Sequence, residues 1–494
     1  MEEDGPKMVE VYQKRKEKSV YTQITLAFLS NFSNIAPGMS IGFSAVAIPA
    51  LKNLDDQQIS WFASIASLAT PLGCILSGPI ADRYGRKCSI AVVNIAAFIG
   101  WLIVASAYHL PNQQYEILLV GRFLTGLSTG LCGTPAAVYM AEVASSKLRS
   151  VFTTWVSLFY AIGIFKVYLL GLILKDDWGT ISLIAAVCPI IGLIFLKLFI
   201  PESPPWLITK QRLDEAKKNM CRLYGTQTYT AEVREEIETL IANRPIKKEI
   251  QQKTLMQQFV KKLKMLMKKN FLKPYAMVLT FFFFQQFTGI FAIMFYAIDI
   301  VKGAKVELDP YITIVIIAVV RLIAMILLSF FSKHFGRRPL SIMSGSGIAL
   351  SMLILGSYIL AVKQGLITQE QEKSLSFIPL SLLIFYFFIS TMGFYPLPFA
   401  LASEVYPGNI RGTASGISSG SNFLFNFLIV KLYPTMVSNI GAHGVFYFYG
   451  TLGLIGTLFV FCFLPETRGK SLEEIQAFFV GKKTEPILKK PESA

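Results

Sequence analysis

Residues 181–200, ISLIAAVCPIIGLIFLKLFI, decide the fold class, because this run of twenty contains a single charged side chain, Lys197. A helix rises about 1.5 Å per residue, so about 20 apolar residues cross the ~30 Å hydrocarbon core of a bilayer. Residues 90–107 and 311–331 have the same character. Helices are expected because they satisfy their own backbone hydrogen bonds in lipid, and the alternating pattern of a membrane barrel is absent.

The composition agrees with a membrane protein. Of the 494 residues, 53% are hydrophobic and 16% are charged, whereas soluble proteins carry about 25% charged residues. The net charge of +16 does not indicate a nucleic-acid partner, because Lys and Arg gather at the amino terminus, in residues 201–273, near Arg83 and Arg337, and in the carboxyl tail. By the positive-inside rule, both termini and the long middle connection are cytoplasmic.

Twelve apolar stretches in two groups of six predict an all-α membrane protein of twelve transmembrane helices in two six-helix halves. The spans are expected near residues 21–51, 57–81, 88–108, 115–138, 151–174, 178–200, 273–301, 310–332, 340–362, 377–403, 412–438 and 442–464. The expected organisation is a cytoplasmic segment at 1–20, a bundle at 21–200, a cytoplasmic linker with amphipathic helices at 201–272, a bundle at 273–464 and a cytoplasmic tail at 465–494.

The two halves repeat one another. The pair Glu142 and Arg149 recurs as Glu404 and Arg411, with the same spacing between acid and base. PES at 201–203 recurs as PET at 465–467, and the repeated motifs lie about 250 to 265 residues apart. Duplicated halves suit alternating access, in which one half rocks against the other around a site at mid-membrane depth.

Several motifs in order along the chain carry a family resemblance. They are GPIADRYGRK at 78–87, GRF at 121–123, the two acid–arginine pairs, PESPPWL at 201–207, QQFTGI at 285–290 and PETRG at 465–469. Together they resemble the sugar porter family of the major facilitator superfamily, over roughly residues 20–480. Within that family the sequence is most similar to insect sugar and trehalose carriers. The resemblance implies the major facilitator fold and a sugar carrier.

Charged side chains gather at the expected cytoplasmic helix ends, where charge-assisted bonds could clamp the helices together. The resemblance implies that this clamp stabilises the outward-open state; the alternative is that the charges only set the topology. Lys333 stands where the first half has Asp82, which predicts a weaker second clamp. The expected gating residues are Asp82, Arg83, Arg86, Glu142, Arg149 and Glu202, with Arg337, Arg338, Glu404, Arg411 and Glu466 in the second half.

Amides inside apolar spans form the candidate substrate site. Gln285 and Gln286 enter the seventh span, and Asn422 and Asn426 share one face of the eleventh. Amides donate and accept hydrogen bonds, which suits sugar hydroxyls, and an aromatic ring such as Phe399 can stack on the C–H side of a sugar. The resemblance implies sugar-binding roles for Gln285, Gln286 and Asn426, with Phe399 where the family usually has Trp. Hydrogen bonds between helices are the alternative.

Four departures from the family pattern indicate a rebuilt site or a substrate other than an ordinary hexose. Phe291 stands where the family usually has Asn, Ser157 where it has Gln, Thr391 where Glu is frequent and Arg321 where Asn is frequent. Arg321 should lie near the membrane midplane, where a guanidinium costs about 2.5 to 3.5 kcal/mol. We expect it to face the central cavity and contact an electronegative solute, or else to be satisfied by helix carbonyls, water or an acid.

The leading interpretation is a monomeric plasma-membrane uniporter for a sugar, surrounded by the lipid bilayer and without a cofactor or metal. Residues 21–51 contain no Asp or Glu, which disfavours proton coupling. The alternatives are a carrier of an anionic or other non-hexose metabolite, possibly proton-coupled, and a nutrient sensor that does not transport. An enzyme is disfavoured, because no P-loop, metal-ligand cluster or Ser/His/Asp constellation is present. Gly393, Pro396 and Pro398 should break the tenth span as a gate segment.

Overall fold

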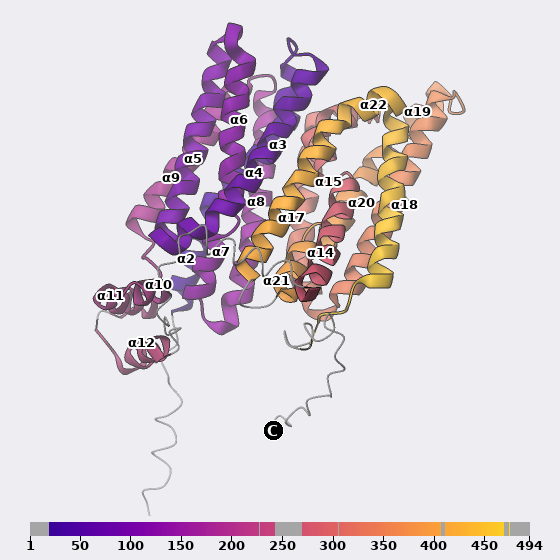
Figure 1. The fold of residues 1–494 in the computed structure, drawn as a ribbon. Coiled ribbons are helices and arrows are strands. Elements are labelled where there is room, and N and C mark those ends of the chain that lie inside the picture. Colours follow the sequence, from indigo (N-terminus) through magenta and orange to yellow (C-terminus); the bar gives the residue numbers. More distant parts are fainter. Residues whose placement is uncertain are drawn as a thin grey trace, which may run out of the picture.

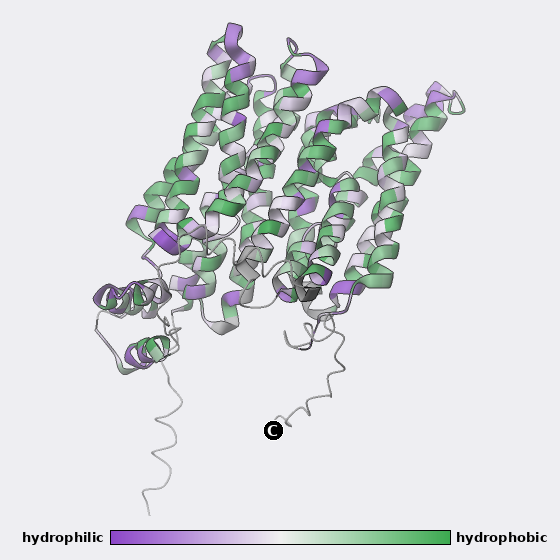
Figure 2. Cartoon of the chain, viewed as in Figure 1, coloured by the Kyte–Doolittle hydropathy of each residue, from purple (hydrophilic) through white to green (hydrophobic). Residues whose placement is uncertain are grey.

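The computed structural model describes residues 19–226, 228–242, 269–304, 306–406, 411–468 and 474, and in this part of the chain all regular structure is helical. The helices form two bundles side by side, one coloured indigo to magenta and the other red to yellow (Figure 1). Hydrophobic residues dominate the middle of the long helices, and hydrophilic residues gather at their ends (Figure 2). The prediction of an all-α membrane protein is confirmed.

The first bundle is built from long helices with short connections, and its first and fourth crossings are interrupted. A 3₁₀ turn, η2 (Phe32–Asn34), separates α2 from α3, and a short turn separates α6 from α7. The helices are α2 (Val20–Asn31), α3 (Ile35–Ala47), α4 (Asp56–Tyr84), α5 (Arg86–Ser106), α6 (Gln114–Leu131), α7 (Pro135–Val143), α8 (Ser146–Leu174) and α9 (Trp178–Leu198).

Three short helices follow the first bundle at its lower end in Figure 1: α10 (Pro204–Thr209), α11 (Leu213–Tyr224) and α12 (Ala231–Ala242). Residues 243–268, the later part of the linker in which amphipathic helices are expected, lie outside the described residues. The second bundle contains α14 (Lys269–Phe287), α15 (Ile290–Phe295), α16 (Ala297–Gly303), α17 (Pro310–His334), α18 (Arg337–Lys363), α19 (Gln369–Ser374), α20 (Phe377–Met392), α21 (Leu397–Val405) and α22 (Arg411–Phe463).

Ten helices of the described part are long and apolar enough to cross a membrane. They cover eleven predicted spans, because α22 contains the last two, joined at Gly441, whose φ of 70° and ψ of 165° are not helical. The remaining predicted span, residues 21–51, is made up of α2 and α3. Each of these helices alone is too short to be counted among the ten. The number of twelve crossings therefore stays a prediction.

Two crossings of the second bundle are broken along their length. Gly289 separates α14 from α15 with a φ of +86°, and a Cβ there would lie 2.4 Å from the ring of Tyr449. Only glycine combines that backbone conformation with so close an approach. The tenth span ends as α20 at Met392 and resumes as α21 at Leu397, so the break predicted from Gly393 and the prolines is confirmed.

The end of the molecule opposite the charged motifs is closed. All residues of α3 and α15 are buried, and these two helices contact each other across the halves. Ser60 Oγ donates a hydrogen bond of 2.8 Å to the carbonyl of Lys431, whose ammonium lies 4.1 Å from the ring centroid of Trp61. Tyr168 donates a further bond of 2.9 Å to the carbonyl of Met294. Side chains and backbone therefore join the halves on this side.

Candidate functional site

A small cavity lies between the two halves, beside the break at Gly289. Its volume is about 10 Å³, roughly what one water molecule needs. The two halves therefore close tightly around this point in the present conformation. The cavity is lined by Ser40, Ile41, Ala66, Ser67, Thr70 and Thr129 from the first half and by Phe291, Phe295, Phe423 and Asn426 from the second.

A chain of hydrogen bonds crosses from the second half to the first at this cavity. Gln286 Nε2 donates to Asn422 Oδ1 at 2.7 Å, and Gln286 Oε1 accepts from Asn426 Nδ2 at 3.2 Å. Ser67 Oγ of the first half donates to Asn426 Oδ1. All four side chains are buried, and Asn422 Nδ2 has no partner among the described residues. The structure thus brings three predicted amides together and leaves the Asn422 Nδ2 group free to donate a hydrogen bond. Contact of these amides with a solute stays a prediction.

The other predicted substrate residues occupy different surroundings. Of the predicted substrate residues, Asn426 and Phe291 line the cavity; those that do not are Gln285, Gln286, Asn422, Thr391, Ser157, Phe399 and Arg321. The Gln285 amide donates to a backbone carbonyl of the broken tenth crossing, and the Thr391 hydroxyl donates at 2.7 Å within its own helix. Ser157 is exposed, and the Phe399 ring packs 4.9 Å from that of another phenylalanine. Gln285 therefore braces the seventh crossing against the tenth in this conformation.

Arg321 lies inside the second half and is only 3% exposed. Its Nη1 contacts the sulfur of Met294, and its guanidinium carbon lies 5.8 and 5.2 Å from the ring centroids of Phe387 and Tyr395. Among the described residues Nη2 has no hydrogen-bond partner, and no carboxylate pairs with this cation. Arg321 does not line the cavity; it connects to it through Tyr395, whose ring packs 5.8 Å from Phe291. Its contact with a solute stays a prediction.

A second buried cation, Arg122, entered the sequence interpretation only as part of a motif. It donates to the carbonyl of Ser40 at 2.7 Å and to the hydroxyl of Ser44 at 2.7 Å. The rings of Phe43 and Phe62 lie 5.8 and 5.4 Å from its guanidinium carbon. The sequence did carry a signal for this contact. Ser40 and Ser44 lie four residues apart on one helical face, and Arg122 is a cation inside a span.

The buried hydroxyl groups along α4, of which Ser67 and Thr70 line the cavity, were also missed. Ser60, Ser64, Ser67 and Thr70 recur every three or four residues along α4 and are all buried. Ser64 and Thr70 donate back to carbonyls of their own helix at 2.7 and 2.8 Å, while Ser60 and Ser67 reach the other half. This spacing is the recognisable signal of a polar stripe on one helix face.

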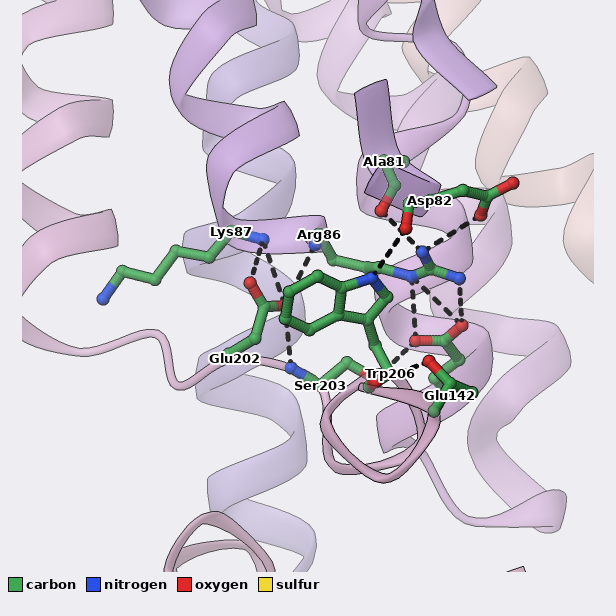
Figure 3. Close-up of polar contacts among 9 residues, drawn as sticks. Ala81, Asp82, Arg86, Lys87, Glu142, Glu202, Ser203 and Trp206 are labelled. Carbon is green, nitrogen blue, oxygen red and sulfur yellow. Dashed lines mark hydrogen bonds and ion pairs between the residues drawn. The ribbon is translucent and has the colours of Figure 1, made fainter. Parts of the chain in front are cut away.

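The first-half charge cluster joins the ends of α4, α5 and α7 (Figure 3). Arg86 donates from Nε to both carboxylate oxygens of Glu142 at 3.1 Å and from Nη2 at 2.7 Å. Its Nη1 reaches Asp82 at 3.2 Å, and Ser203 Oγ donates to the same Glu142 carboxylate. The Arg86 and Glu142 side chains are only 11% and 20% exposed. These are the shielded, bidentate contacts in which an ion pair is strong.

Glu202 caps the start of α5 from the segment before α10. Its carboxylate accepts backbone N–H bonds from Arg86 at 3.0 Å, Lys87 at 3.2 Å and Ser203 at 2.9 Å. A helix N-terminus favours a negative charge. Burial nevertheless raises the pKa of Glu202 above its ordinary value, outweighing the lowering by these amides. A Cβ at Gly85 would lie 2.3 Å from this carboxylate, so the motif requires glycine there.

The described residues of the second half repeat the arrangement with fewer contacts. Arg337 Nη2 reaches Glu404 Oε1 at 3.1 Å, and Thr467 Oγ1 donates to the other carboxylate oxygen at 2.7 Å. Glu466 accepts from the backbone N–H groups of Arg337 at 3.0 Å and Arg338 at 3.1 Å. Burial raises the pKa of Glu466, but the backbone amides outweigh burial and hold the pKa below its ordinary value. Among the described residues, one hydrogen bond between Arg337 and Glu404 stands where Arg86 and Glu142 make three.

Each charge cluster lies within one half. At this end of the molecule, no ion pair among the described residues joins the halves. The pair that does, Lys175 with Asp309 at 3.9 Å, lies at the opposite end. Arg149 is exposed without a described partner, Arg83 packs 5.4 Å from a tyrosine ring, and the Arg411 side chain lies outside the described residues. The described part holds no group of three or more His, Cys, Asp or Glu suited to a metal ion.

A family model described as "Sugar (and other) transporter" matches residues 9–479. The chain belongs to this sugar transporter family. Membership confirms the resemblance predicted from the motifs and groups the chain with transporters, not with enzymes. The multi-pass membrane character expected from the composition is likewise that of the family.

Two insect relatives span almost all of the chain. The facilitated trehalose transporter Tret1 of Aedes aegypti is 29% identical over 489 residues, which are 97% of this chain and 58% of that protein. The chain thus spans little more than half of that relative's length. The Tret1 protein of Polypedilum vanderplanki is also 29% identical, with 97% of this chain and 92% of that protein covered.

Solved structures share the fold. A partially occluded inward-open conformation of the xylose transporter XylE from E. coli gives a TM-score of 0.74 at 19% identity, covering 91% of this chain and all of that one. The proton:xylose symporter XylE bound to 6-bromo-6-deoxy-D-glucose gives 0.69 at 22% identity, covering 93% and 99%. The sugar transporter chain therefore has the major facilitator fold that its motifs implied.

Proposed function

We propose that this protein is a facilitative carrier that moves a sugar across a membrane by alternating access. The observation that carries the proposal is the buried chain of Gln286, Asn422, Asn426 and Ser67, which links the two halves at the central cavity. Each bond in this chain can be exchanged for a bond to a sugar hydroxyl when the halves separate, because amides and hydroxyls both donate and accept. Trehalose is the first sugar to test, since both insect relatives are named trehalose transporters.

Uniport is the mode of transport that the first half supports. Arg122 is held by the serines Ser40 and Ser44, and α2 and α3 contain no carboxylate that could bring a proton to it. A carrier whose site contains only neutral hydrogen-bonding groups has no side chain there that changes charge between pH 5 and 8. We therefore expect sugar flux that follows the sugar gradient and does not respond to a proton gradient.

Uptake by the purified full chain in proteoliposomes tests both statements. We expect saturable uptake of trehalose or a hexose that is unchanged by an imposed pH gradient. Asn426→Ala and Gln286→Ala should each raise KM about five- to 150-fold, because a buried hydrogen-bonding group is worth about 1 to 3 kcal/mol. The matched control is Asn94→Ala, a buried amide that bonds to Ser33 within the first half. An equal rise of KM in the control would contradict a substrate role for Gln286 and Asn426.

Arg321 supports a second candidate, a carrier of an anionic or otherwise electronegative solute. The Arg321 guanidinium is buried, its Nη2 is free and it has no carboxylate partner in the described part. A charged group inside a membrane is seldom retained without a partner, so a bound solute is a candidate for that partner. Comparing uptake of a neutral sugar with that of its acid analogue, in wild type and in Arg321→Asn, separates the candidates. A loss confined to the acid analogue supports the anionic substrate. An unchanged selectivity ratio with lower protein abundance assigns Arg321 a structural role.

The proposed setting follows from the charge distribution. Both termini and the linker at 201–272 are proposed to be cytoplasmic. The protein is proposed to lie in the plasma membrane and to work as a monomer, with one bundle at 21–200 and the other at 273–464. A protease added outside intact cells should then leave the linker uncut. Cleavage of the linker under these conditions would reverse the proposed orientation.

A further inference from the structure

A second cavity lies at the proposed cytoplasmic end of the first half, away from the central site. It forms where the end of α4 and the start of α5 meet the end of α9 and the helices α10 and α11. Its volume is about 350 Å³, within the range of roughly 300 to 1,000 Å³ that small-ligand pockets occupy. The transport cycle proposed above assigns no role to this space.

The charges that line this cavity do not balance. Four basic side chains face two acidic ones, and both acids are already engaged. Glu202 is occupied by three backbone N–H groups, and Glu215 pairs with Arg212 at 2.6 Å. The cavity therefore holds an excess of positive charge that its own carboxylates do not neutralise.

Three cations are left without a carboxylate partner among the described residues: Lys87, Lys197 and Arg222. They come from α5, α9 and α11, so three separate elements converge on one space. Figure 3 shows the Lys87 side chain extending away from Glu202, although its own backbone N–H binds that carboxylate. The Lys87 ammonium lies 3.5 Å from the carbonyl of Lys197, its one hydrogen bond in the described part. Such a convergence is suited to a multiply charged anion.

Apolar side chains on the rim place the opening at the edge of the bilayer. Tyr84 and Leu198 line the cavity, are 56% and 59% exposed, and end two of the helices long enough to cross a membrane. Phe199, next to Leu198, is 52% exposed. A small anion dissolved in the cytoplasm would make no contact with these apolar side chains. A phospholipid carries a charged headgroup and apolar chains in one molecule, so it can contact both the cations and the apolar rim.

We propose that this cavity binds the phosphorylated headgroup of an anionic phospholipid of the cytoplasmic leaflet, with its acyl chains along Leu198 and Phe199. Basic pockets at the cytoplasmic ends of membrane helices are suited to phosphoinositide headgroups. A bound headgroup bridges α5, α9 and α11 next to Glu202, the carboxylate that caps α5. The lipid therefore holds the linker helices against the bundle whose charge cluster they complete.

Native mass spectrometry of the purified full chain tests this site with two lipid probes, phosphatidylinositol 4-phosphate and phosphatidylcholine. The variant is Lys197→Ala with Arg222→Ala, whose exposed charged groups make no ion pair in the described part. The matched control is Lys217→Ala with Lys218→Ala, which removes the same charge from α11 outside the cavity. Each cation near a membrane surface contributes about a factor of five in affinity, so the variant should bind phosphatidylinositol 4-phosphate about 25-fold more weakly.

The expected pattern is a preference for phosphatidylinositol 4-phosphate over phosphatidylcholine that the variant loses and the control keeps. An equal loss in variant and control overturns the site, because the preference then reflects net charge alone. A third arm titrates inositol 1,4-bisphosphate and inorganic phosphate into the same protein. If these soluble phosphates bind as tightly as the lipid, with the same loss in the variant, the ligand is a free phosphate compound and the lipid proposal fails.

Discussion

Replacing Glu142 by Gln should destabilise the first half more than the equivalent Glu404→Gln change destabilises the second. The substitution keeps the shape of the side chain but removes the charge that holds Arg86 through contacts of 3.1, 3.1 and 2.7 Å. Breaking a buried ion pair costs about 3 to 5 kcal/mol. Gln retains one carbonyl acceptor and Asp82 remains 3.2 Å from Arg86, so we expect a loss of about 2 to 3 kcal/mol.

The second-half pair should be worth less. Arg337 makes one contact of 3.1 Å with Glu404, and the two side chains are 27% and 25% exposed. Solvent screens such a pair, and a single charge-assisted bond of this kind is worth about 1 kcal/mol. Glu215→Gln is the surface control, because the Arg212 and Glu215 side chains are each about half exposed and such pairs contribute about 0 to 1 kcal/mol.

Thermal unfolding of the purified variants in detergent measures the difference. For units of the size of one half, 1 kcal/mol corresponds to about 2 to 4 °C in Tm. We expect Glu142→Gln to lower Tm by about 4 to 12 °C, Glu404→Gln by about 2 to 4 °C and Glu215→Gln by less. Equal shifts for Glu142→Gln and Glu404→Gln, or a first-half shift no larger than that of the control, would refute the reasoning from contact number and burial.

Three further changes test the gates and the break in the seventh crossing. Trp61→Ala removes the ring that the Lys431 ammonium contacts and should raise the proportion of outward-open molecules about two- to fivefold. Cysteine accessibility from each side measures this proportion. An unchanged proportion would show that the contact does not hold the halves together. Arg149→Ala should change that proportion without lowering Tm, because Arg149 is exposed and has no described partner in this closed-outside structure; a Tm loss instead would give it a structural role. Gly289→Ala should abolish folded protein or transport, since a Cβ would meet Tyr449 at 2.4 Å, and full activity would show that the break can relax.

Much of the fold followed from the sequence because the bilayer imposes simple demands. Runs of about 20 apolar residues, basic loops and a motif order repeated in both halves predict helices, sidedness and duplication. Gly393 and Pro396 predicted the break in the tenth crossing because their backbone properties are local. The 3₁₀ turn at Phe32–Asn34 carried no such residue, so the division of the first crossing had no local signal.

The candidate site was harder to predict because partners come from distant segments. Asn426 was recognisable as an amide in a span, but its bond to Ser67 crosses 359 positions of sequence, and serine is too frequent to be singled out. Arg321 was expected near the midplane from its position within the eighth span, yet its surroundings of aromatic rings depend on how the tenth crossing breaks beside Tyr395. Side-chain surroundings of this kind are set by packing between helices, which periodicity within one helix does not specify.

The near-absence of free volume at the central cavity has a consequence for ligand discovery. A space of about 10 Å³ admits no sugar-sized inhibitor, so a screen against this conformation would direct chemists to surface grooves instead of the transport pathway. Competitive inhibitors would have to be selected against molecules whose halves have parted, for example with antibodies that trap that form. Antibodies raised against the present form would act differently: they would block transport by keeping the pathway shut, without resembling the cargo.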